Sequence, residues 1–499
     1  MPGFEAETLL AYFLEAALRH PAKLALRCES EALPYHELRS RILRTAARLR
    51  SLGVREGDRV LLCAPNSLAL PVLYFAVHAL AAVAVPVPPE TPEAVLAALA
   101  ADAEARLAVV CGAGRHAVQS TPACPVVSSA EIAALDTEEI YPIHHPDAIA
   151  DLLYTTGTTG RKKGVALTHA NILAAARNIT AFVGERPDDV EVVPLPLTHS
   201  FGLGRLRCLA LTGHTLVLEP GVGTGAHLVK RILDLQATGL ALVPTGFDIL
   251  RRMTADALGQ ARDHLRYIEI GSAPIHPATR EWLAALLPYT RICHHYGLTE
   301  ASRAAFTDYH ADAHKRGTAG RAAPNVEIAI CSESGERLPA GVIGEVVVRG
   351  GMVMREYWKQ PELTGETFCP EGLKTGDIGY LDPDGYLFLI GRRGDLINVG
   401  GRKVAPGEIE LLLCEMEGVR DAGCVAEPDD LMGECVKAYL VADREIGRRE
   451  VTAFLRPRLE EFKIPHSVER IDRIPRTSSG KIQRQALRAG KEPAWTREP

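Results

Sequence analysis

The chain has 499 residues, too many for one compact core, so two or more domains are expected. Hydrophobic residues make up 47% and charged residues 24% of the sequence, which excludes an intrinsically disordered protein. A formal net charge of -6 argues against a general nucleic-acid-binding protein, because such proteins usually carry a basic excess.

The cysteines and the start of the chain give no sign of a metal site or an export signal. The eleven cysteines are dispersed and none forms a CxxC pair, so neither a zinc site nor a disulfide scaffold is expected. Glu5 and Glu7 stand where a signal peptide would have a basic start and an apolar run. Residues 68–88 are nearly all apolar, but prolines interrupt them, which favours a buried helix and a strand over a membrane span. A cytoplasmic protein is therefore expected.

Helical and strand-like segments alternate through the first part of the chain. The segments with helical spacing are 9–18 and 35–49, and short apolar runs of strand length are 60–63, 107–110, 190–195, 215–218 and 240–244. Such alternation predicts an α/β architecture with largely parallel sheets.

The character of the sequence changes near residues 391–395. Before this point, the turn sequence Asp-Pro-Asp-Gly at 382–385 links two short strands. After it comes a segment of roughly a hundred residues, a normal size for a small domain, with its own helix and strand patterns. We therefore predict two domains, residues 1–393 and 394–499.

The strongest local signal is the loop at residues 154–164, which reads Tyr-Thr-Thr-Gly-Thr-Thr-Gly-Arg-Lys-Lys-Gly. Backbone N–H groups can wrap a polyphosphate, threonine hydroxyls add donors, and lysine adds positive charge. The spacing differs from that of the P-loop, and the alternative to a phosphate site is a flexible basic surface loop. The residues predicted to bind phosphate are Thr155, Thr156, Gly157, Thr158, Thr159, Gly160 and Lys163.

A second motif, His-Tyr-Gly-Leu-Thr-Glu at residues 295–300, is weak when taken alone. The ring of Tyr296 could stack on a purine, Thr299 could donate to a phosphate, and Glu300 could hold Mg²⁺. A core tyrosine beside a threonine that caps a helix would explain the same residues without a ligand.

Two further motifs contain one charged residue on a short turn. Asp377, in Lys-Thr-Gly-Asp-Ile-Gly-Tyr at 374–380, could accept from both hydroxyls of a ribose or could cap its own backbone turn. Lys481 follows Ser-Ser-Gly and could deliver a mobile cation to an anionic reaction centre, or could belong to a surface turn before a final helix.

These four motifs, in this order, resemble those of the adenylate-forming superfamily of acyl-CoA synthetases, peptide-synthetase adenylation domains and firefly luciferase. The resemblance covers nearly the whole chain, including residues 33–38 and 462–465. It implies a large N-terminal domain of α/β sheets with a β-barrel-like subdomain, and a small mobile α+β C-terminal domain. It also implies ATP and Mg²⁺, with CoA or a carrier-protein phosphopantetheine as the acyl acceptor.

The resemblance implies a role for each motif in binding ATP and in the first reaction. The loop at 154–164 would hold the β- and γ-phosphates, Thr299 would contact the α-phosphate, and Glu300 would bind Mg²⁺. Lys481 would bridge the substrate carboxylate and the α-phosphate. The adenine slot would consist of Ser272, Ala273, Pro274, Tyr296 and Gly297, and the ribose would lie on Asp377 and Arg392.

In the second reaction of such families the C-terminal domain rotates about a hinge, here at Gly394. Lys481 would leave, and Gly400 and Gly401 would line a channel for the pantetheine thiol. The family usually has aspartate or lysine at the hinge, and glycine leaves the end states of rotation less sharply defined. The family also usually has proline where this chain has Lys162, and an additional cation there is compatible with phosphate.

Residues 196–202 resemble the segment that lines the acyl pocket. Amino-acid-activating relatives have aspartate where this chain has Ser200, so an α-ammonium group would be buried without a counter-charge. Gly202 and Gly246 lack side-chain bulk, which predicts a roomy apolar pocket for a fatty or aromatic acid. The predicted pocket residues are His199, Ser200, Phe201, Gly202, Gly246 and Gly271; His199 resembles a gate residue, or is a core histidine.

The predicted function is that of an AMP-forming acid–thiol ligase that adenylates a hydrophobic carboxylic acid and transfers it to CoA. Its predicted catalytic residues are Lys481, Thr299, Glu300 and His199. One alternative is a stand-alone adenylation enzyme that loads an acyl or amino acid onto a carrier protein. The other is a non-catalytic nucleotide-binding relative, against which the presence of Lys481 and Glu300 argues.

Overall fold

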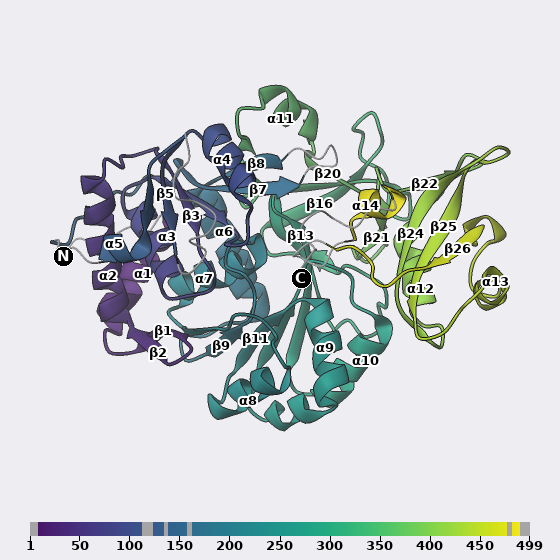
Figure 1. Cartoon of the computed structure of the whole chain (residues 1–499), viewed down its shortest axis with the longest axis horizontal. Coiled ribbons are helices and arrows are strands. Elements are labelled where there is room, and N and C mark those ends of the chain that lie inside the picture. Colours follow the sequence, from purple (N-terminus) through teal and green to yellow (C-terminus); the bar gives the residue numbers. More distant parts are fainter. Residues whose placement is uncertain (1–7, 112–122, 134–137, 157–161, 477–481, 490–499) are drawn as a thin grey trace. The chain divides into compact units, whose positions relative to one another are not determined.

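The computed structural model describes residues 8–111, 123–133, 138–156, 162–476 and 482–489 (Figure 1). The chain divides into two compact units, Met1–Ile328 with Val348–Leu373, and Ala329–Val347 with Lys374–Pro499. The predicted boundary at residues 393 and 394 falls within the second unit, and a functional joint at that point stays a prediction.

A nine-stranded sheet forms one half of the first unit. In spatial order it contains β15 (Arg321–Ala322), β14 (Ala301–Asp308), β13 (Arg291–Leu298), β12 (Tyr267–Ile270), β11 (Gly239–Leu242), β9 (Val190–Val193), β10 (Thr215–Leu218), β1 (Leu24–Cys28) and β2 (Glu31–Pro34). The strands from β13 to β1 pair in parallel, and the edge strands pair antiparallel. Because the carboxyl ends of parallel strands share one sheet edge, the loops that follow β12 and β13 are neighbours.

A seven-stranded sheet forms the other half of this unit. Its order is β18 (Glu356–Tyr357), β8 (Lys162–Thr168), β7 (Ile149–Thr156), β4 (Val83–Val87), β3 (Arg59–Cys63), β5 (Ala105–Val110) and β6 (Val126–Ser128). The strands from β7 to β6 are parallel, whereas β7, β8 and β18 pair antiparallel. The alternation that predicted parallel sheets is confirmed in both sheets.

The helices of the first unit connect these strands (Figure 1). They are α1 (Leu9–Arg19), α2 (Tyr35–Ser51), α3 (Ala69–Ala79), α4 (Glu93–Asp102), α5 (Ser129–Ala133), α6 (His169–Val183), α7 (Ser200–Thr212), α8 (Ala226–Asp234), α9 (Pro244–Thr254), α10 (Pro277–Leu286) and α11 (Pro361–Thr367). The apolar segment 68–88 forms the buried helix α3 and the buried strand β4, as predicted. Within the described ranges, the structure contains no helix long and apolar enough to cross a membrane.

Two smaller sheets follow later in the chain. One has β16 (Val326–Cys331), β17 (Gly344–Gly350), β20 (Gly372–Leu381) and β19 (Phe368–Cys369) in that order, with β21 (Leu387–Arg392) paired to β20. The other has β23 (Arg402–Val404), β22 (Ile397–Val399), β25 (Gly433–Ala442) and β24 (Val419–Asp429), with β26 (Ser467–Arg470) paired to β25. The helices α12 (Pro406–Leu413), α13 (Arg448–Leu455) and α14 (Arg484–Ala489) accompany this last sheet. Ile409, Leu413 and Val451 bury apolar side chains against it.

Candidate active site

The predicted phosphate loop joins two paired strands. Strands β7 and β8 are antiparallel, with Thr155 opposite Lys163 and Thr156 opposite Lys162. Gly157, Thr158, Thr159 and Gly160, which follow β7 in the sequence, lie outside the described residues. The structure therefore places Thr156 and Lys162 opposite each other at the two ends of the loop. The role of the residues between them stays a prediction.

Tyr357 links the phosphate hairpin to the predicted magnesium ligand. Strand β18 adds to β8 with Tyr357 opposite Val165. The Nζ of Lys163 lies 5.3 Å from the centroid of the Tyr357 ring, and the hydroxyl of that ring donates to Oε1 of Glu300 at 2.8 Å. The backbone N–H of Met354 also donates to the carbonyl of Glu300. A lysine and a carboxylate from distant motifs thus contact the same tyrosine, and a polyphosphate with a divalent cation needs charges of both signs in one place.

Thr299 and Glu300 form the turn of a tight hairpin. Strands β13 and β14 pair antiparallel, and Leu298 lies opposite Ala301, so these two residues alone make the connection. Gly297 is required for close packing, because a Cβ there would lie 2.5 Å from the backbone nitrogen of Arg303. The helix-cap alternative for Thr299 is wrong, since both flanking elements are strands.

The predicted adenine loop follows β12 and has a strained backbone. Ser272 has a φ of 76°, in the left-handed region that costs a residue with a Cβ roughly 1 kcal/mol or more. His294 on β13 supports this loop, since its Nε2–H donates to the carbonyl of Ala273 at 3.1 Å. The hydroxyl of Tyr309 donates to His294 Nδ1 at 3.1 Å. Burial lowers the pKa of His294 to about 4, so the ring is neutral at pH 7 and keeps both bonds.

His294 and Tyr357 were not among the residues predicted from the sequence. His294 follows from the parallel pairing of β12 and β13, which places it opposite Ile270, directly before the adenine loop. Tyr357 lies on a two-residue strand, which is too short to give a sequence pattern, so no signal in the sequence pointed to it.

His199 lies at the start of α7, in the segment predicted to line the acyl pocket. Burial lowers its pKa; the nearby charge of Lys162 acts in the same direction, and Glu90 opposes it. The histidine is therefore neutral at pH 7 and lies within electrostatic reach of the start of β8, the strand that follows the phosphate loop.

The glycines of the predicted acyl pocket have close neighbours. A Cβ at Gly202 would lie 2.4 Å from the backbone oxygen of Pro196, so glycine lets α7 start against that segment. A Cβ at Gly246 would lie 2.6 Å from Cγ of the Leu242 side chain. Close packing, more than open space, accounts for glycine at position 202, whereas at position 246 the neighbour is a movable side chain.

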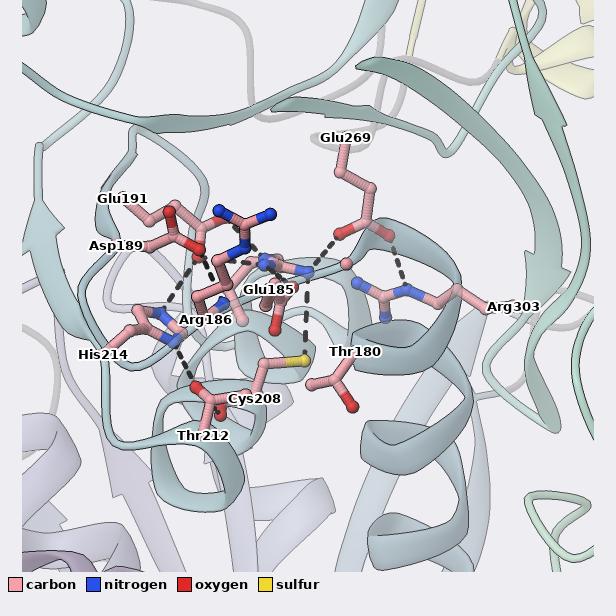
Figure 2. A network of polar contacts seen from close by, with 12 residues as sticks. Thr180, Glu185, Arg186, Asp189, Glu191, Cys208, Thr212, His214, Glu269 and Arg303 are labelled. Atoms are coloured by element: carbon pink, nitrogen blue, oxygen red, sulfur yellow. Dashed lines mark hydrogen bonds and ion pairs between the residues drawn. The ribbon is translucent and has the colours of Figure 1, made fainter. Parts of the chain in front are cut away.

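A buried network of charged side chains contacts the start of α7 (Figure 2). Arg303 donates from Nε to Glu269 at 3.1 Å and from its two terminal nitrogens to the carbonyls of Ser200 and Phe201 at 3.1 and 3.0 Å. Arg205 donates to the other oxygen of Glu269 at 2.6 Å. Burial alone would raise the pKa of Glu269, but Arg303 and Arg205 outweigh it and hold the pKa well below its usual range.

The network continues away from Glu269 to Glu185, Glu191 and His214 (Figure 2). Burial raises the pKa of Glu185, although Arg205 opposes this. Glu269 is on β12, Arg205 is on α7 and Arg303 is on β14. The network therefore links the elements that carry the acyl segment, the adenine loop and the Thr299–Glu300 turn. Isolated arginines and glutamates form no motif, so the sequence alone did not predict these residues.

The second unit holds the predicted ribose residues. Asp377 on β20 lies opposite Arg392 on β21, and Arg392 Nε donates to Asp377 Oδ1 at 3.1 Å. The carboxylate is largely buried, with a side chain 13% exposed, while the arginine is 43% exposed. The two residues are brought together as a pair, and their contact with a ribose stays a prediction.

The hinge and thiol-channel glycines lie in two turns of the second unit. Gly400 and Gly401, with φ of 55° and 84°, connect β22 and β23 in a two-residue hairpin turn that favours glycine at both positions. Gly394 lies in the turn after β21, where a Cβ would meet no described atom within 4 Å. Lys481 lies outside the described residues.

Comparison with known proteins identifies the family. The sequence model of the AMP-binding enzyme family matches residues 13–358, and that of its C-terminal domain matches residues 408–481. The chain therefore belongs to the AMP-binding enzyme family, and the resemblance carried by the four motifs is confirmed.

Three relatives illustrate the family. The feruloyl-CoA synthase of Amycolatopsis sp is 34% identical, covering 94% of this chain and 96% of its own length. The fatty acid–[acyl-carrier-protein] ligase ScoC of Streptomyces coeruleorubidus is 32% identical, covering 97% and 96%. The structure of O-succinylbenzoate coenzyme A synthetase (MenE) from Bacillus subtilis with ATP and magnesium ion aligns with a TM-score of 0.86 at 28% identity, covering 96% and 99%. The predicted arrangement of a large α/β part and a small C-terminal part is confirmed.

Proposed function

We propose that this protein is an AMP-forming acid–thiol ligase that joins a carboxylic acid to CoA. The observation that carries the proposal is the convergence of Lys163 and Glu300 on Tyr357, beside the turn that presents Thr299. The relatives named as a CoA synthase and a CoA synthetase support the same activity.

In the first reaction an oxygen of the substrate carboxylate attacks the α-phosphorus of ATP, and the bond to pyrophosphate breaks. Lys163 and the threonine-rich loop stabilise the charge on the leaving pyrophosphate. Glu300, fixed by Tyr357, is the residue that would hold Mg²⁺, which neutralises phosphate charge when bound. Thr299 and Lys481 contact the α-phosphate, so the rate comes from positioning and charge stabilisation without a covalent enzyme nucleophile.

In the second reaction the thiol of CoA attacks the carbonyl carbon of the adenylate, and AMP leaves. The thiol proton is released as the carbon–sulfur bond forms. Rotation about Gly394 withdraws Lys481 and places the Gly400–Gly401 turn beside the thiol. The absence of Cβ atoms in this turn lets the narrow pantetheine arm pass close to the backbone.

The acid is hydrophobic, either fatty or aromatic. Ser200 supplies no carboxylate to pair with an α-ammonium group, and the neutral ring of His199 supplies no negative charge. Gly246 tests this directly, because the nearest described atoms to a Cβ there belong to the movable side chain of Leu242. Gly246→Val should shorten the accepted chain, and the double variant with Leu242→Ala should restore it; unchanged selectivity in Gly246→Val would contradict the pocket assignment.

A carrier-protein phosphopantetheine is the second candidate acceptor. The 32% identity to a fatty acid–[acyl-carrier-protein] ligase over nearly the whole chain favours keeping it. Both acceptors present the same pantetheine thiol, so the first reaction and its residues are common to the two functions.

The experiment that tests the proposal is pyrophosphate release with MgATP against fatty, aromatic and amino acids, with and without CoA. A hydrophobic acid should give release and a CoA thioester, and Lys481→Ala should abolish release. Lys230→Ala is the control, since that lysine is 70% exposed and pairs only locally with Asp234. Adenylate without a CoA thioester would transfer the assignment to a carrier protein, and no release with any acid would overturn the enzyme assignment.

A further inference from the structure

Three side chains with different ligand atoms meet at one end of the last sheet. Asp429 ends β24, Cys435 lies on β25, and His466 directly precedes β26. One carboxylate oxygen, one sulfur and one ring nitrogen from these residues all lie within 4.8 Å of one another. The three residues belong to the second unit, and the two reactions described above use none of them.

The pairing of the three strands holds these side chains together. Asp429 lies opposite Gly433 in the β24–β25 hairpin, and Cys435 follows two residues further along β25. The N–H of His466 donates to the carbonyl of Val436 at 2.8 Å, where β26 begins to pair with β25. The cluster is assembled by the sheet from separate parts of the chain, so the spacing of cysteines in the sequence could not reveal it.

The two oxygens of the Asp429 carboxylate have different neighbours. Oδ1 accepts from the backbone N–H groups of Leu431 and Met432 at 3.0 and 2.8 Å, which orients the side chain. Oδ2 lies 3.6 Å from Nδ1 of His466. This distance is too long for a hydrogen bond, but two ligand atoms of a tetrahedral zinc ion, with bonds of about 2.0–2.3 Å, lie roughly 3.3–3.6 Å apart.

Cys435 contributes a buried thiol to the cluster. The residue is 3% exposed, and its sulfur forms no hydrogen bond or disulfide with the residues that the structure describes. The nearby carboxylate of Glu427 already has partners, because it accepts from the hydroxyl of Ser467 at 2.6 Å and lies 3.7 Å from Nζ of Lys437. Burial raises the pKa of the Cys435 thiol, and Glu427 and Asp429 act in the same direction. A metal ion would displace the thiol proton and give the buried sulfur a partner.

We propose that Asp429, Cys435 and His466 bind one zinc ion, with water at the fourth position. Thiolate sulfur, imidazole nitrogen and carboxylate oxygen are all zinc ligands, whereas Mg²⁺ and Ca²⁺ prefer oxygen alone. The side chain of His466 is 43% exposed, so an ion can enter from solvent. The inference does not depend on the proposed function.

The zinc site would act on the turn that contacts Gly400. The carbonyl of Met432 accepts from the N–H of Gly400 at 2.9 Å, and the N–H of Met432 donates to Asp429. An ion that holds Asp429 would therefore hold the β24–β25 turn on which Gly400 rests. We assign the ion a structural role, and Zn²⁺ should raise the Tm of the wild-type protein because it binds the folded chain.

Binding of Co²⁺ and Zn²⁺ to the full-length, metal-free protein without ATP tests the proposal. One equivalent of Co²⁺ should give a sulfur-to-metal charge-transfer band in the near ultraviolet, and Zn²⁺ should abolish this band by displacing Co²⁺. The band requires a cysteine ligand, so it separates this site from the predicted Mg²⁺ site at Glu300. Competition with a chelating dye gives the Kd for Zn²⁺.

Each ligand can be removed separately. Cys435→Ala should abolish the charge-transfer band. Asp429→Asn and His466→Ala should each weaken Zn²⁺ binding by about 100-fold or more, since loss of a residue that only orients a ligand already costs about 10–100-fold. Asparagine at position 429 keeps an oxygen that can accept from the N–H groups of Leu431 and Met432, which preserves the turn.

Two neighbouring substitutions are matched controls. Asp430→Asn changes an exposed carboxylate next to Asp429, and Cys369→Ala removes a cysteine that is less buried than Cys435. Both variants should keep the band and the Zn²⁺ affinity of the wild type. Circular dichroism of each metal-free variant verifies folding.

Absence of the band in the wild type, or a band that survives in Cys435→Ala, would overturn the inference. Equal Zn²⁺ affinities of Asp429→Asn and Asp430→Asn would also overturn it. Metal binding is measured without substrate, so failure of the proposed function, namely no pyrophosphate from any acid, is a separate result.

Discussion

The hydroxyl of Tyr357 donates a hydrogen bond to Oε1 of Glu300 at 2.8 Å, across 57 residues of sequence. Tyr357→Phe removes this bond and leaves the ring beside Lys163. Since a residue that orients a metal-binding carboxylate affects metal affinity about 10-fold or more, the Mg²⁺ concentration for half-maximal pyrophosphate release should rise by about that factor. Tyr289→Phe, at a tyrosine 83% exposed, is the control and should change nothing. An unchanged Mg²⁺ dependence in Tyr357→Phe would contradict the proposal that Tyr357 orients Glu300 as a metal ligand.

Arg303 should be important for stability as well as for the site. Arg303→Met removes the side-chain donor to the carbonyls of Ser200 and Phe201 and one of the two arginines on Glu269. Removing one partner of a buried ion pair costs about 3 kcal/mol or more, and urea unfolding measures this directly. Arg316→Met, whose side chain is 81% exposed, should change the free energy of unfolding by about 0.5 kcal/mol or less. Equal effects of the two substitutions would contradict the energetic role of the network.

His294 predicts a dependence of stability on pH. Its pKa is about 4 in the folded chain and about 6.5 in the unfolded chain. Between these values the unfolded chain binds a proton here and the folded chain does not, so the free energy of unfolding falls as the pH decreases from about 6.5 toward 4. One such proton gives a slope of about 1.4 kcal/mol per pH unit.

His294→Gln isolates this contribution. The glutamine amide can donate to Ala273 and accept from Tyr309, yet it does not titrate. Urea unfolding at pH 7, 6 and 5 should show a smaller loss of stability in the variant than in the wild type. A parallel loss in both proteins would show that His294 binds its proton equally in the folded and unfolded chains.

The Gly400–Gly401 turn should affect the second reaction more than the first. Gly401→Ala places a Cβ on a residue with a φ of 84°, which costs about 1 kcal/mol and distorts the turn. Thioester formation, followed by mass spectrometry, should slow several-fold while adenylate formation, trapped with hydroxylamine, stays unchanged. Gly407→Ala is the control, because its position at the start of α12 has no positive φ and no close neighbour. An equal effect on both reactions would dissociate this turn from the thiol.

Periodicity and motif order were sufficient for the fold class. The apolar segment that becomes α3 and β4 could be assigned because its prolines and length suit a helix and a strand better than a membrane span. The runs at 60–63 and 107–110 became β3 and β5 because buried parallel strands are continuously apolar.

The supporting residues of the site could not be predicted in the same way. Glu269, Arg205 and Arg303 lie on three different elements, and only the folded sheet brings them together. Gly202 illustrates a second difficulty, since a glycine that opens a pocket and a glycine that permits close packing have the same letter. Its contact with the Pro196 backbone decides the matter and depends on tertiary structure.

The chain crosses between its two compact units three times, after residues 328, 347 and 373. Exchange of the C-terminal part between relatives, whether by natural recombination or by the design of chimeric enzymes, must respect these crossings. A graft that starts at residue 394 would separate Arg392 and Asp377 from the rest of their own unit. Grafts that carry 329–347 together with 374–499 would keep each folding unit intact, and they are the exchanges that selection should tolerate.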